Sequence, residues 1–391
     1  MMDRLFALFA SLVLFAFLSP LRAAEAPVEP STFGMHILHP GDYPAPFPFG
    51  TLRLWDAGTP WKKMNPAPGQ YDFSVLDHWL DLAARNHWDV VYTFGHTPPW
   101  AAREGNEAMP PADLRAWDDF VRALATHAAG RIQYWEMWNE PTLPRFFQGS
   151  PAELAEMTRR AAAIIKSIDP SARILGASPV GEEKITPWLD AYFAAGAGSA
   201  IDIVAFHGYL RRKPPEQILK LLQSIRGTMS AHQIGNKPLW DTEASWGEEK
   251  DLPDPEAQAA YLARYYLLQR SHRVDRFIWY AWHETGFGAL KDAGGPRQAA
   301  TAYAQMYQWL VGAAFEQPCA GNGHRLWRCE VSRPGGYRAQ IVWDLDPDVS
   351  YTPPTAFRQY RTLDGRTGPI DGPVRIGPQP VLLETGMAPA S

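Results

Sequence analysis

The sequence has little of what marks several large protein classes. Only 2 of its 391 residues are cysteines, and its formal net charge of −5 comes with no long run of lysine and arginine. We therefore expect no nucleic-acid partner, because nothing would follow a phosphate backbone. No CxxC pair, histidine cluster, G-x-S-x-G elbow or glycine-rich nucleotide loop is present, so we expect no metal, no cofactor and no serine esterase chemistry.

The N-terminus is the one place with a long apolar run. Arg4 precedes an apolar stretch from Leu5 to Leu18, and small residues follow around Ala23 to Ala26. The stretch is shorter than the ~18–20 residues that a membrane-spanning helix needs. The order is that of a secretory signal peptide over residues 1–26, so we expect a secreted or periplasmic protein with no membrane span after signal removal.

The two cysteines, Cys319 and Cys329, lie close together in the sequence. In an oxidising compartment they could join, and we expect a disulfide. Two free buried thiols are the alternative. Aromatic residues, by contrast, are abundant, with 16 Trp, 15 Tyr and 18 Phe. Most should pack in the core, but some rings could face a sugar, whose C–H faces stack on Trp and Tyr.

Eight short apolar runs alternate with segments of helical spacing. The predicted strands are Phe33–Ile37, Thr51–Trp55, Asp89–Phe94, Ile132–Trp138, Arg173–Ala177, Ile201–Phe206, Pro238–Thr242 and Phe277–Trp282. The predicted helices include Phe73–Asn86, Leu114–Ala128, Pro151–Ile168 and Pro255–Ser271. This rhythm predicts an α/β fold, a (β/α)₈ TIM barrel over residues 27–312.

The pattern changes after about Ala313 to short strands separated by Gly and Pro. Examples are Arg325–Val331, Tyr337–Trp343 and Val374–Leu383. We predict a small, β-sandwich-like C-terminal domain over residues 313–391 that supports the barrel, and a monomer.

Two of the predicted barrel strands end in a glutamate. The fourth runs into Glu140 within Trp135–Pro141, and the seventh runs into Glu243 within Trp240–Trp246. Barrel active sites form where the strands end, so the two carboxyl groups should face each other across the mouth. Glycosidic cleavage needs such a pair, and a separation of about 5–5.5 Å leads to retention of configuration.

These motifs resemble the clan A superfamily of (β/α)₈ retaining glycoside hydrolases, and within it most of all glycoside hydrolase family 39. Four segments carry the likeness: Thr97–Ala101, Trp135–Pro141, Phe206–Tyr209 and Trp279–Trp282. The likeness covers the barrel and not the C-terminal domain. Family 39 contains β-xylosidases, α-iduronidases and endoglycosidases acting on bacterial exopolysaccharide.

The resemblance implies that Glu140 is the acid and base, that Glu243 is the nucleophile, and that Asn139 binds the sugar 2-hydroxyl. An apolar wall such as Trp138 should raise the pKa of Glu140. The residues expected to bind substrate around this pair are Arg53, His207 and Tyr209, which should keep Glu243 ionised, His36, His96 and Trp282 at the ends of strands, and Trp100 and Trp246 in aromatic loops.

Two further acidic residues are predicted to be structural. Glu136 has the parity of Glu140 but lies one layer deeper, where pairing with Arg53 is expected. The same interpretation applies to Asp241 beneath Glu243. Glu284 follows the eighth strand and could line the cleft.

The sequence thus predicts an enzyme, a retaining glycoside hydrolase that is endo-acting on a β-linked polysaccharide or exopolysaccharide and forms a covalent glycosyl-enzyme on Glu243. Two alternatives stay open. One is an exo-acting, β-xylosidase-like glycosidase with the same catalytic residues. The other is a non-catalytic carbohydrate-binding protein on the same barrel, against which the retention of both glutamates argues.

Overall fold

Parallel strands alternate with helices along the first three quarters of the chain. The structure is a computed structural model that describes residues 26–43, 47–283, 286–323 and 325–386. The predicted signal peptide lies, except for Ala26, outside the described residues. Within the described ranges, no helix has both the length and the apolar character needed to cross a bilayer.

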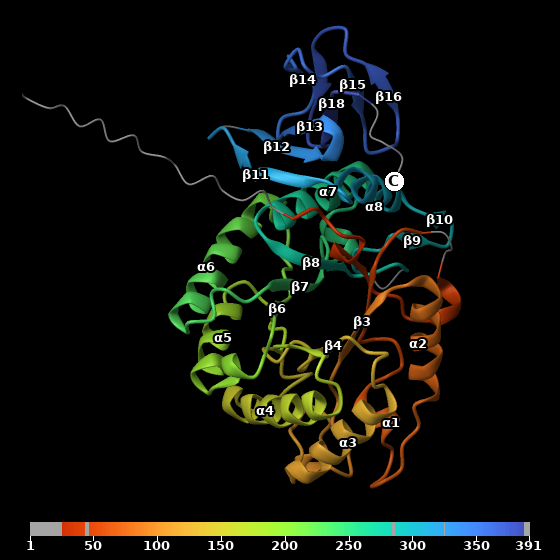
Figure 1. The fold of residues 1–391 in the computed structure, drawn as a ribbon, viewed down its shortest axis with the longest axis vertical. Coiled ribbons are helices and arrows are strands. Elements are labelled where there is room, and N and C mark those ends of the chain that lie inside the picture. Colours follow the sequence, from red (N-terminus) through yellow and green to blue (C-terminus); the bar gives the residue numbers. More distant parts are fainter. Residues whose placement is uncertain (1–25, 44–46, 284–285, 324, 387–391) are drawn as a thin grey trace, which may run out of the picture.

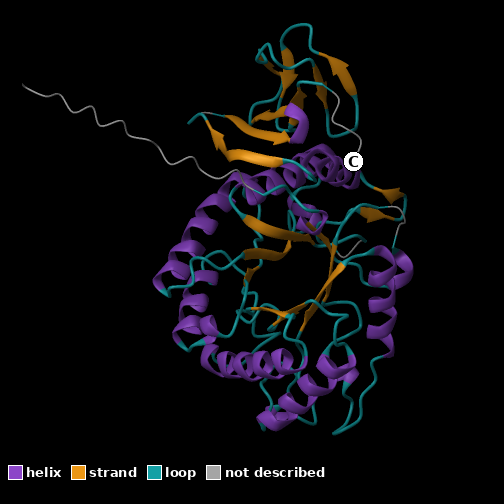
Figure 2. Ribbon diagram, in the orientation of Figure 1, coloured by secondary structure: helices purple, strands orange, loops and turns teal. Residues whose placement is uncertain are grey.

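Eight parallel strands form the barrel (Figures 1 and 2). They are β1 (Phe33–Met35), β2 (Thr51–Leu54), β3 (Asp89–Thr93), β4 (Tyr134–Glu136), β5 (Arg173–Leu175), β6 (Val204–Phe206), β7 (Leu239–Ala244) and β8 (Val274–Trp279). The sheet runs in the order β5-β4-β3-β2-β1-β8-β7-β6. Parallel bridges from Leu175 to Ile203 and from Val180 to His207 join its two ends, which closes the barrel. The predicted fold class is confirmed.

A ring of helices surrounds the strands (Figure 2). They are α1 (Trp61–Met64), α2 (Ser74–Asn86), α3 (Leu114–His127), α4 (Pro151–Ile168), α5 (Ile185–Ala194), α6 (Ile218–Ala231), α7 (Pro255–Ser271) and α8 (Gln298–Leu310). The predicted bounds of α4 and α7 coincide with the observed ones. Local chemistry explains this: Ser150 and Glu153 form a reciprocal capping box at the start of α4, and Asp254 caps α7.

The eighth strand begins and ends earlier than predicted. β8 covers Val274–Trp279, and the chain leaves the sheet at Tyr280. The apolar residues Ala281 and Trp282 continue the run in the sequence but are buried outside the strand. The apolar run therefore predicted burial correctly. Hydrophobicity alone, however, does not show at which residue the hydrogen-bonded strand ends.

The interior of the barrel holds a small apolar core above a buried arginine. Side chains of Val91, Leu175, Ile203, Ala205, Trp240 and Ile278 form a separate apolar core inside the barrel. Below it, at the end where the strands begin, Arg276 lies over the rings of Tyr134 and Trp240, with its guanidinium carbon 4.4 Å from each ring centre. It also bonds to Asp89 at 2.6 Å and Thr51 at 2.9 Å.

The C-terminal residues form antiparallel sheets. The larger sheet has the order β11-β12-β13-β18-β15-β16, and β14 pairs with β17. The strands are β11 (Ala314–Gly321), β12 (Leu326–Arg333), β13 (Tyr337–Asp344), β14 (Val349–Tyr351), β15 (Gln359–Arg361), β16 (Thr367–Pro369), β17 (Val374–Ile376) and β18 (Val381–Glu384), while β9 (Lys291–Asp292) and β10 (Gly295–Pro296) form a hairpin beside the barrel.

The predicted single strand Val374–Leu383 is wrong: it is two strands in two sheets. Gly377, Pro378 and Pro380 separate β17 from β18. Proline has no backbone N–H to give to a ladder, which explains the break.

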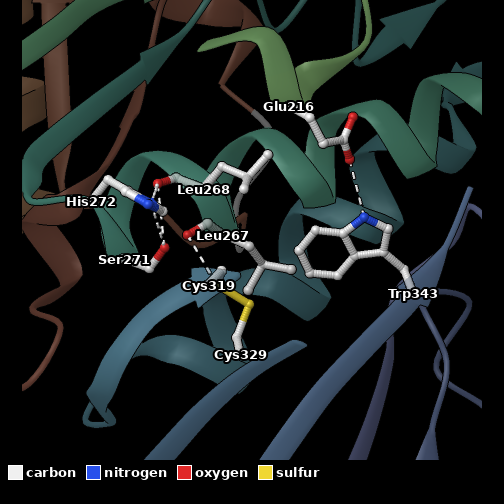
Figure 3. Close-up of a disulfide and its surroundings, with 8 residues drawn as sticks. All are labelled: Glu216, Leu267, Leu268, Ser271, His272, Cys319, Cys329 and Trp343. Atoms are coloured by element: carbon white, nitrogen blue, oxygen red, sulfur yellow. Dashed lines mark hydrogen bonds between the residues drawn. A yellow bond between two sulfur atoms is a disulfide. The ribbon is translucent and has the colours of Figure 1, made fainter. Parts of the chain in front are cut away.

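The C-terminal sheets pack directly on α7 (Figure 1). Figure 3 shows the disulfide between Cys319 on β11 and Cys329 on β12, with the Cys319 sulfur 3.6 Å from the carbonyl oxygen of Leu267 on α7. Nearby, the Trp343 indole N–H donates to Glu216 at 3.0 Å. The predicted disulfide is confirmed.

Candidate active site

Glu140 and Glu243 come from opposite arcs of the barrel mouth. Glu243 lies on β7, and Glu140 follows β4 in a turn where Trp138 and Glu140 have the positive φ angles of 86° and 42°. Such angles strain residues other than glycine. The turn is held by the Glu140 backbone N–H, which donates to the Ser178 carbonyl oxygen at 3.0 Å. Both glutamates are buried, at 4% and 7% exposure.

The two carboxyl groups converge. One oxygen of Glu140, one oxygen of Glu243 and a ring nitrogen of His207 all lie within 4.8 Å of one another. His207 Nδ1 is 3.0 Å from Glu140 and 3.9 Å from Glu243. A terminal nitrogen of the Arg53 guanidinium lies 2.8 Å from a carboxylate oxygen of Glu243. The arrangement therefore combines two carboxyl groups, a cation and an imidazole around one small volume.

Arg53 links two polar residues at the mouth to a third one below them. Its Nε donates to Glu136 at 2.7 Å, one terminal nitrogen donates to Glu243 at 2.8 Å, and the other donates to Asn139 at 2.9 Å. The side chain is completely buried, so its charge is not screened by water. Because the oxygen of Asn139 is taken by Arg53, its amide nitrogen, which donates to no described residue, remains for a ligand.

Glu136 is structural, as predicted. Besides Arg53, it accepts hydrogen bonds from Thr93 at 2.7 Å and Thr242 at 2.5 Å, and none of its side chain is exposed. Three donated hydrogen bonds, from Arg53, Thr93 and Thr242, therefore hold a carboxylate one layer below the mouth. The network ties β2, β3, β4 and β7 together directly beneath Glu243.

Burial dominates the electrostatics of the carboxyl pair. It raises the pKa of Glu140 to about 7, and the nearby Arg145 opposes the rise. Burial also raises the pKa of Glu243 to about 7, where Glu140 adds to the rise while His207 and Arg53 oppose it. Two buried carboxyl groups this close cannot both ionise easily, so the pair holds a shared proton near neutral pH. Burial lowers the pKa of His207 to about 4, which leaves its ring uncharged.

The turn after β6 brings His207 and Tyr209 to the pair. The Tyr209 hydroxyl donates to Glu243 at 3.0 Å. Between them, the Gly208 N–H donates to buried Asp241 at 3.0 Å, and its carbonyl accepts from Tyr265 of α7 at 2.5 Å. A Cβ at Gly208 would lie 2.3 Å from the Tyr265 hydroxyl, so only glycine fits. Asp241 thus has the structural role predicted for it.

Five of the predicted substrate-binding residues gather around the glutamates, and a sixth lies farther out. Asn139, Arg53, His207 and Tyr209 contact the pair or one another as described, and His36 lies 3.4 Å from Arg53. His36 is also 3.3 Å from the Thr242 carbonyl and buried, so it supports the network from below. His96 is half-buried and stacks on Trp55, with 5.1 Å between ring centres.

Three predicted tryptophan contacts are placed differently. Trp282 is 1% exposed and packs on Phe47, and Trp246 is 2% exposed and packs on Trp279, so neither presents a ring face to solvent. Both rings pack against other aromatic side chains, and their role in substrate binding stays a prediction. Trp100 is exposed, but its indole N–H donates to the Asn65 carbonyl. Glu284 lies outside the described residues.

Two residues at the mouth escaped the sequence analysis. The Tyr280 hydroxyl donates to Asp56 at 2.6 Å, and the Tyr280 ring lies edge-on to His36 at 5.0 Å. Asp56 also raises the pKa of both catalytic candidates, Glu140 and Glu243. Asp56 follows the predicted second strand directly, so its place at the strand end was a usable signal. Tyr280 was hidden because the eighth strand was placed too late.

The chain matches a family model described as "Glycosyl hydrolase catalytic core" over residues 76–310. A β-xylosidase of Caldicellulosiruptor saccharolyticus is 31% identical over 152 residues, which are 35% of this chain and 30% of that protein. The match therefore spans less than a third of the curated relative.

Solved structures share the fold. A family 39 glycoside hydrolase from Bacteroides cellulosilyticus WH2 has a TM-score of 0.74 at 18% identity, covering 91% of this chain and 81% of that chain. A GH39 β-xylosidase from Caulobacter crescentus has 0.65 at 18%, covering 93% and 98%. A GH30 endoxylanase from Clostridium papyrosolvens C71 has 0.62 at 11%, covering 92% and 97%. The predicted resemblance to clan A hydrolases such as family 39 is confirmed, and the chain belongs to the glycosyl hydrolase catalytic core family.

Proposed function

We propose that the protein is a retaining glycoside hydrolase that cuts a β-linked polysaccharide, with Glu140 as the acid and base and Glu243 as the nucleophile. The observation that carries this proposal is the approach of the two buried carboxyl groups to within 4.8 Å at the barrel mouth. Inverting enzymes need space for a water molecule between one carboxylate and the sugar, and that spacing leaves no such space. The second carboxylate must then attack the anomeric carbon itself.

The hydrogen bonds support one distribution of the shared proton. Glu243 accepts from the guanidinium of Arg53 and from the hydroxyl of Tyr209, and both contacts favour its ionised form. Glu140 has the uncharged His207 beside it, and among the described residues the cation in direct contact with it is the largely exposed Arg145, at 3.5 Å. The proton therefore resides on Glu140, ready for the departing oxygen.

The reaction then proceeds in two displacements. Glu243 attacks the anomeric carbon while the glycosidic C–O bond breaks, and the proton of Glu140 passes to the leaving oxygen. Glu140, now a carboxylate, takes a proton from the incoming water as that water attacks the anomeric carbon and frees Glu243. The amide of Asn139, held by Arg53, donates to the sugar 2-hydroxyl.

A second candidate is an exo-acting β-xylosidase, which the 31% identity to a β-xylosidase favours. It shares every catalytic residue with the endo-acting candidate. Product size separates them: internal cuts release a ladder of oligosaccharides from a polysaccharide, while chain-end cuts release monosaccharide alone.

The test uses the full chain with xylan and other β-linked glycans, and follows the configuration of the first product by NMR. We expect the β-anomer first. The α-anomer would overturn the retaining mechanism, and no reducing ends from any glycan, with binding retained, would favour the non-catalytic alternative.

Variants then separate the two roles. Glu243→Gln should abolish turnover of every substrate. Glu140→Gln should still react with a dinitrophenyl glycoside, whose leaving group needs no proton, and added azide should speed the second step and yield a β-glycosyl azide. If Glu243→Gln hydrolyses normally, the nucleophile is wrongly assigned.

A further inference from the structure

Exposed aromatic rings are concentrated at two places in the described part of the chain. Phe287 is 40% exposed and lies beside Tyr209 in the proposed active site, with 6.5 Å between ring centres. Tyr71 and Trp100 are each 37% exposed, and both line a single groove of about 950 Å³. Exposed rings gathered in a concave surface indicate a binding site more strongly than scattered ones.

The groove lies between the segment that precedes α2 and the outer side of α3, in the helix ring seen in Figure 1. Its lining contains none of the residues that surround the two glutamates.

One wall of the groove is fixed by a buried asparagine. The Asn65 amide nitrogen donates to the carbonyl oxygens of Ala67 and Gln70, each at 2.8 Å, and its side-chain oxygen accepts from Trp61 at 3.1 Å. Its own carbonyl accepts the indole N–H of Trp100 at 2.9 Å. The turn and the Trp100 ring are therefore held in place before any ligand arrives, which reduces the entropy lost on binding.

The aromatic surface continues along the groove. Tyr71 stacks on Phe73 with 5.8 Å between ring centres and an interplanar angle of 11°, and Phe73 contacts the His127 ring at 4.6 Å. Flat apolar faces backed by other rings are the surfaces on which pyranose rings stack.

Charges of both signs border the rings. Asp113 and Arg115 pair with each other, and Asp119 and Arg122 make no hydrogen bond or ion pair with any described residue. A border of mixed sign gives no net attraction for a polyanion or for a strongly charged peptide. Free carboxylate and guanidinium groups beside ring faces can instead bond to the hydroxyl groups of an uncharged sugar chain.

The groove and the mouth share one loop. The segment between β3 and α3 places His96 beside Glu107, at 3.7 Å, and it stacks the His96 ring on Trp55 next to the mouth. A few residues later the same segment places Trp100 in the groove.

From the preformed aromatic groove, its mixed-charge border and its place next to the loop shared with the mouth, we propose that it is a second glycan-binding site, which holds a neutral polysaccharide away from the catalytic pair. Binding at this site keeps the polymer near the mouth between cuts and raises its effective concentration there. The prediction that Trp100 contacts sugar is retained in this form.

The test measures binding of the full chain by affinity electrophoresis in gels containing soluble xylan, mixed-linkage β-glucan or galactomannan. We expect at least one polymer to retard the protein. Tyr71→Ala and Trp100→Ala should each weaken that retardation about three- to tenfold. Tyr71→Phe, which keeps the ring, should be retarded as strongly as the wild-type protein. Val75→Ala, a change at an exposed apolar residue outside the groove, should have no effect.

Hydrolysis is measured separately on a small aryl glycoside, so the groove proposal and the proposed function can fail independently. Tyr71→Ala should leave kcat/KM for the aryl glycoside unchanged and raise KM only for the polymer.

Retardation without any hydrolysis would support the groove proposal and overturn the proposed function. The groove proposal is overturned if no polymer retards the protein, or if Tyr71→Ala and Trp100→Ala, unfolding at the wild-type temperature, are retarded as strongly as wild type. Binding of the groove to a purified protein partner, but not to glycan, would overturn it as well.

Discussion

The two ends of the barrel each bury an arginine, and the two arginines have opposite surroundings. At the end where the strands begin, Arg276 bonds to one carboxylate, Asp89, and lies between two aromatic faces. At the mouth, Arg53 contacts Glu136 and Glu243 at once, and Glu140 lies beyond them. Charge is balanced at the first end, while carboxyl groups outnumber cations at the second.

The difference supports the proposal that the mouth, and not the opposite end of the barrel, is the catalytic site. A balanced, stacked pair has no reason to hold or release a proton near neutral pH. An excess of buried carboxyl groups favours keeping a proton near neutral pH, and in the proposed mechanism that proton passes to the departing sugar. The two arginines should therefore respond differently to the same substitution.

The largest effect should come from Arg53→Met. It leaves Glu136 and Glu243 without their buried cation, so we expect kcat/KM to fall by about 10³-fold or more and the free energy of unfolding to fall by about 3–5 kcal/mol. Activity on an aryl glycoside and urea unfolding measure the two quantities. An active Arg53→Met protein would show that the carboxyl pair needs no cation.

A smaller effect is expected where α7 supports the mouth. Gly208→Ala would force a methyl group against the Tyr265 hydroxyl and Asp241, displacing His207 and Tyr209. We expect a loss of about 1–3 kcal/mol in the free energy of unfolding and a fall in kcat larger than the change in KM.

Gly227→Ala is the matched control, because the added Cβ would meet nothing within 4 Å on α6. It should stabilise the fold by about 0.5–1 kcal/mol and leave the rate unchanged. Equal kinetics for the Gly208 and Gly227 variants would mean that the turn does not position the catalytic groups.

Arg276→Met tests the other end of the barrel. Loss of its contacts with Tyr134, Trp240 and Asp89 should reduce the free energy of unfolding by about 2–3 kcal/mol. At temperatures where the variant stays folded, kcat/KM should equal the wild-type value. A large loss of activity in the folded variant would remove the distinction between the two ends.

The smallest effect concerns the pH profile. The positive charge of Arg145 opposes the burial that raises the pKa of Glu140. Because the proposed mechanism needs Glu140 protonated, removing that charge should move the alkaline limb of the kcat/KM profile to higher pH in Arg145→Ala, and the acidic limb should stay in place. The shift should be small, because Arg145 is 70% exposed. An alkaline limb that moves to lower pH would contradict the assignment of the acid.

The fold was predictable where local chemistry marks the ends of elements. The caps at Ser150 and Asp254 fixed the starts of α4 and α7, and the apolar runs located all eight barrel strands. Strand ends were harder to predict, because Trp282 is buried whether or not it belongs to β8. The division of the chain into domains at residues 312 and 313 stays a prediction, although the helical pattern does end with α8 at Leu310.

The site was predictable as far as strand ends determine it. Glu140 and Glu243 lie just beyond the ends of predicted strands and Arg53 lies near the end of another, so their convergence follows from the barrel alone. The barrel fold does not determine the direction in which a loop side chain points. Trp100 and Trp246 share the same sequence character, yet one ring is exposed in an outer groove and the other is covered by Trp279. Tyr280 required the true end of β8, whereas Asp56 directly follows the predicted second strand and could have been found from the sequence.

The burial of α7 determines how the protein unfolds. α7 is buried along nearly its whole length, because the barrel covers one side and the strands around the Cys319–Cys329 bond cover the other. Truncation after Leu310 would leave that apolar helix facing water. The C-terminal sheets and the barrel should therefore melt in a single transition, and the shortest chain that folds must include both.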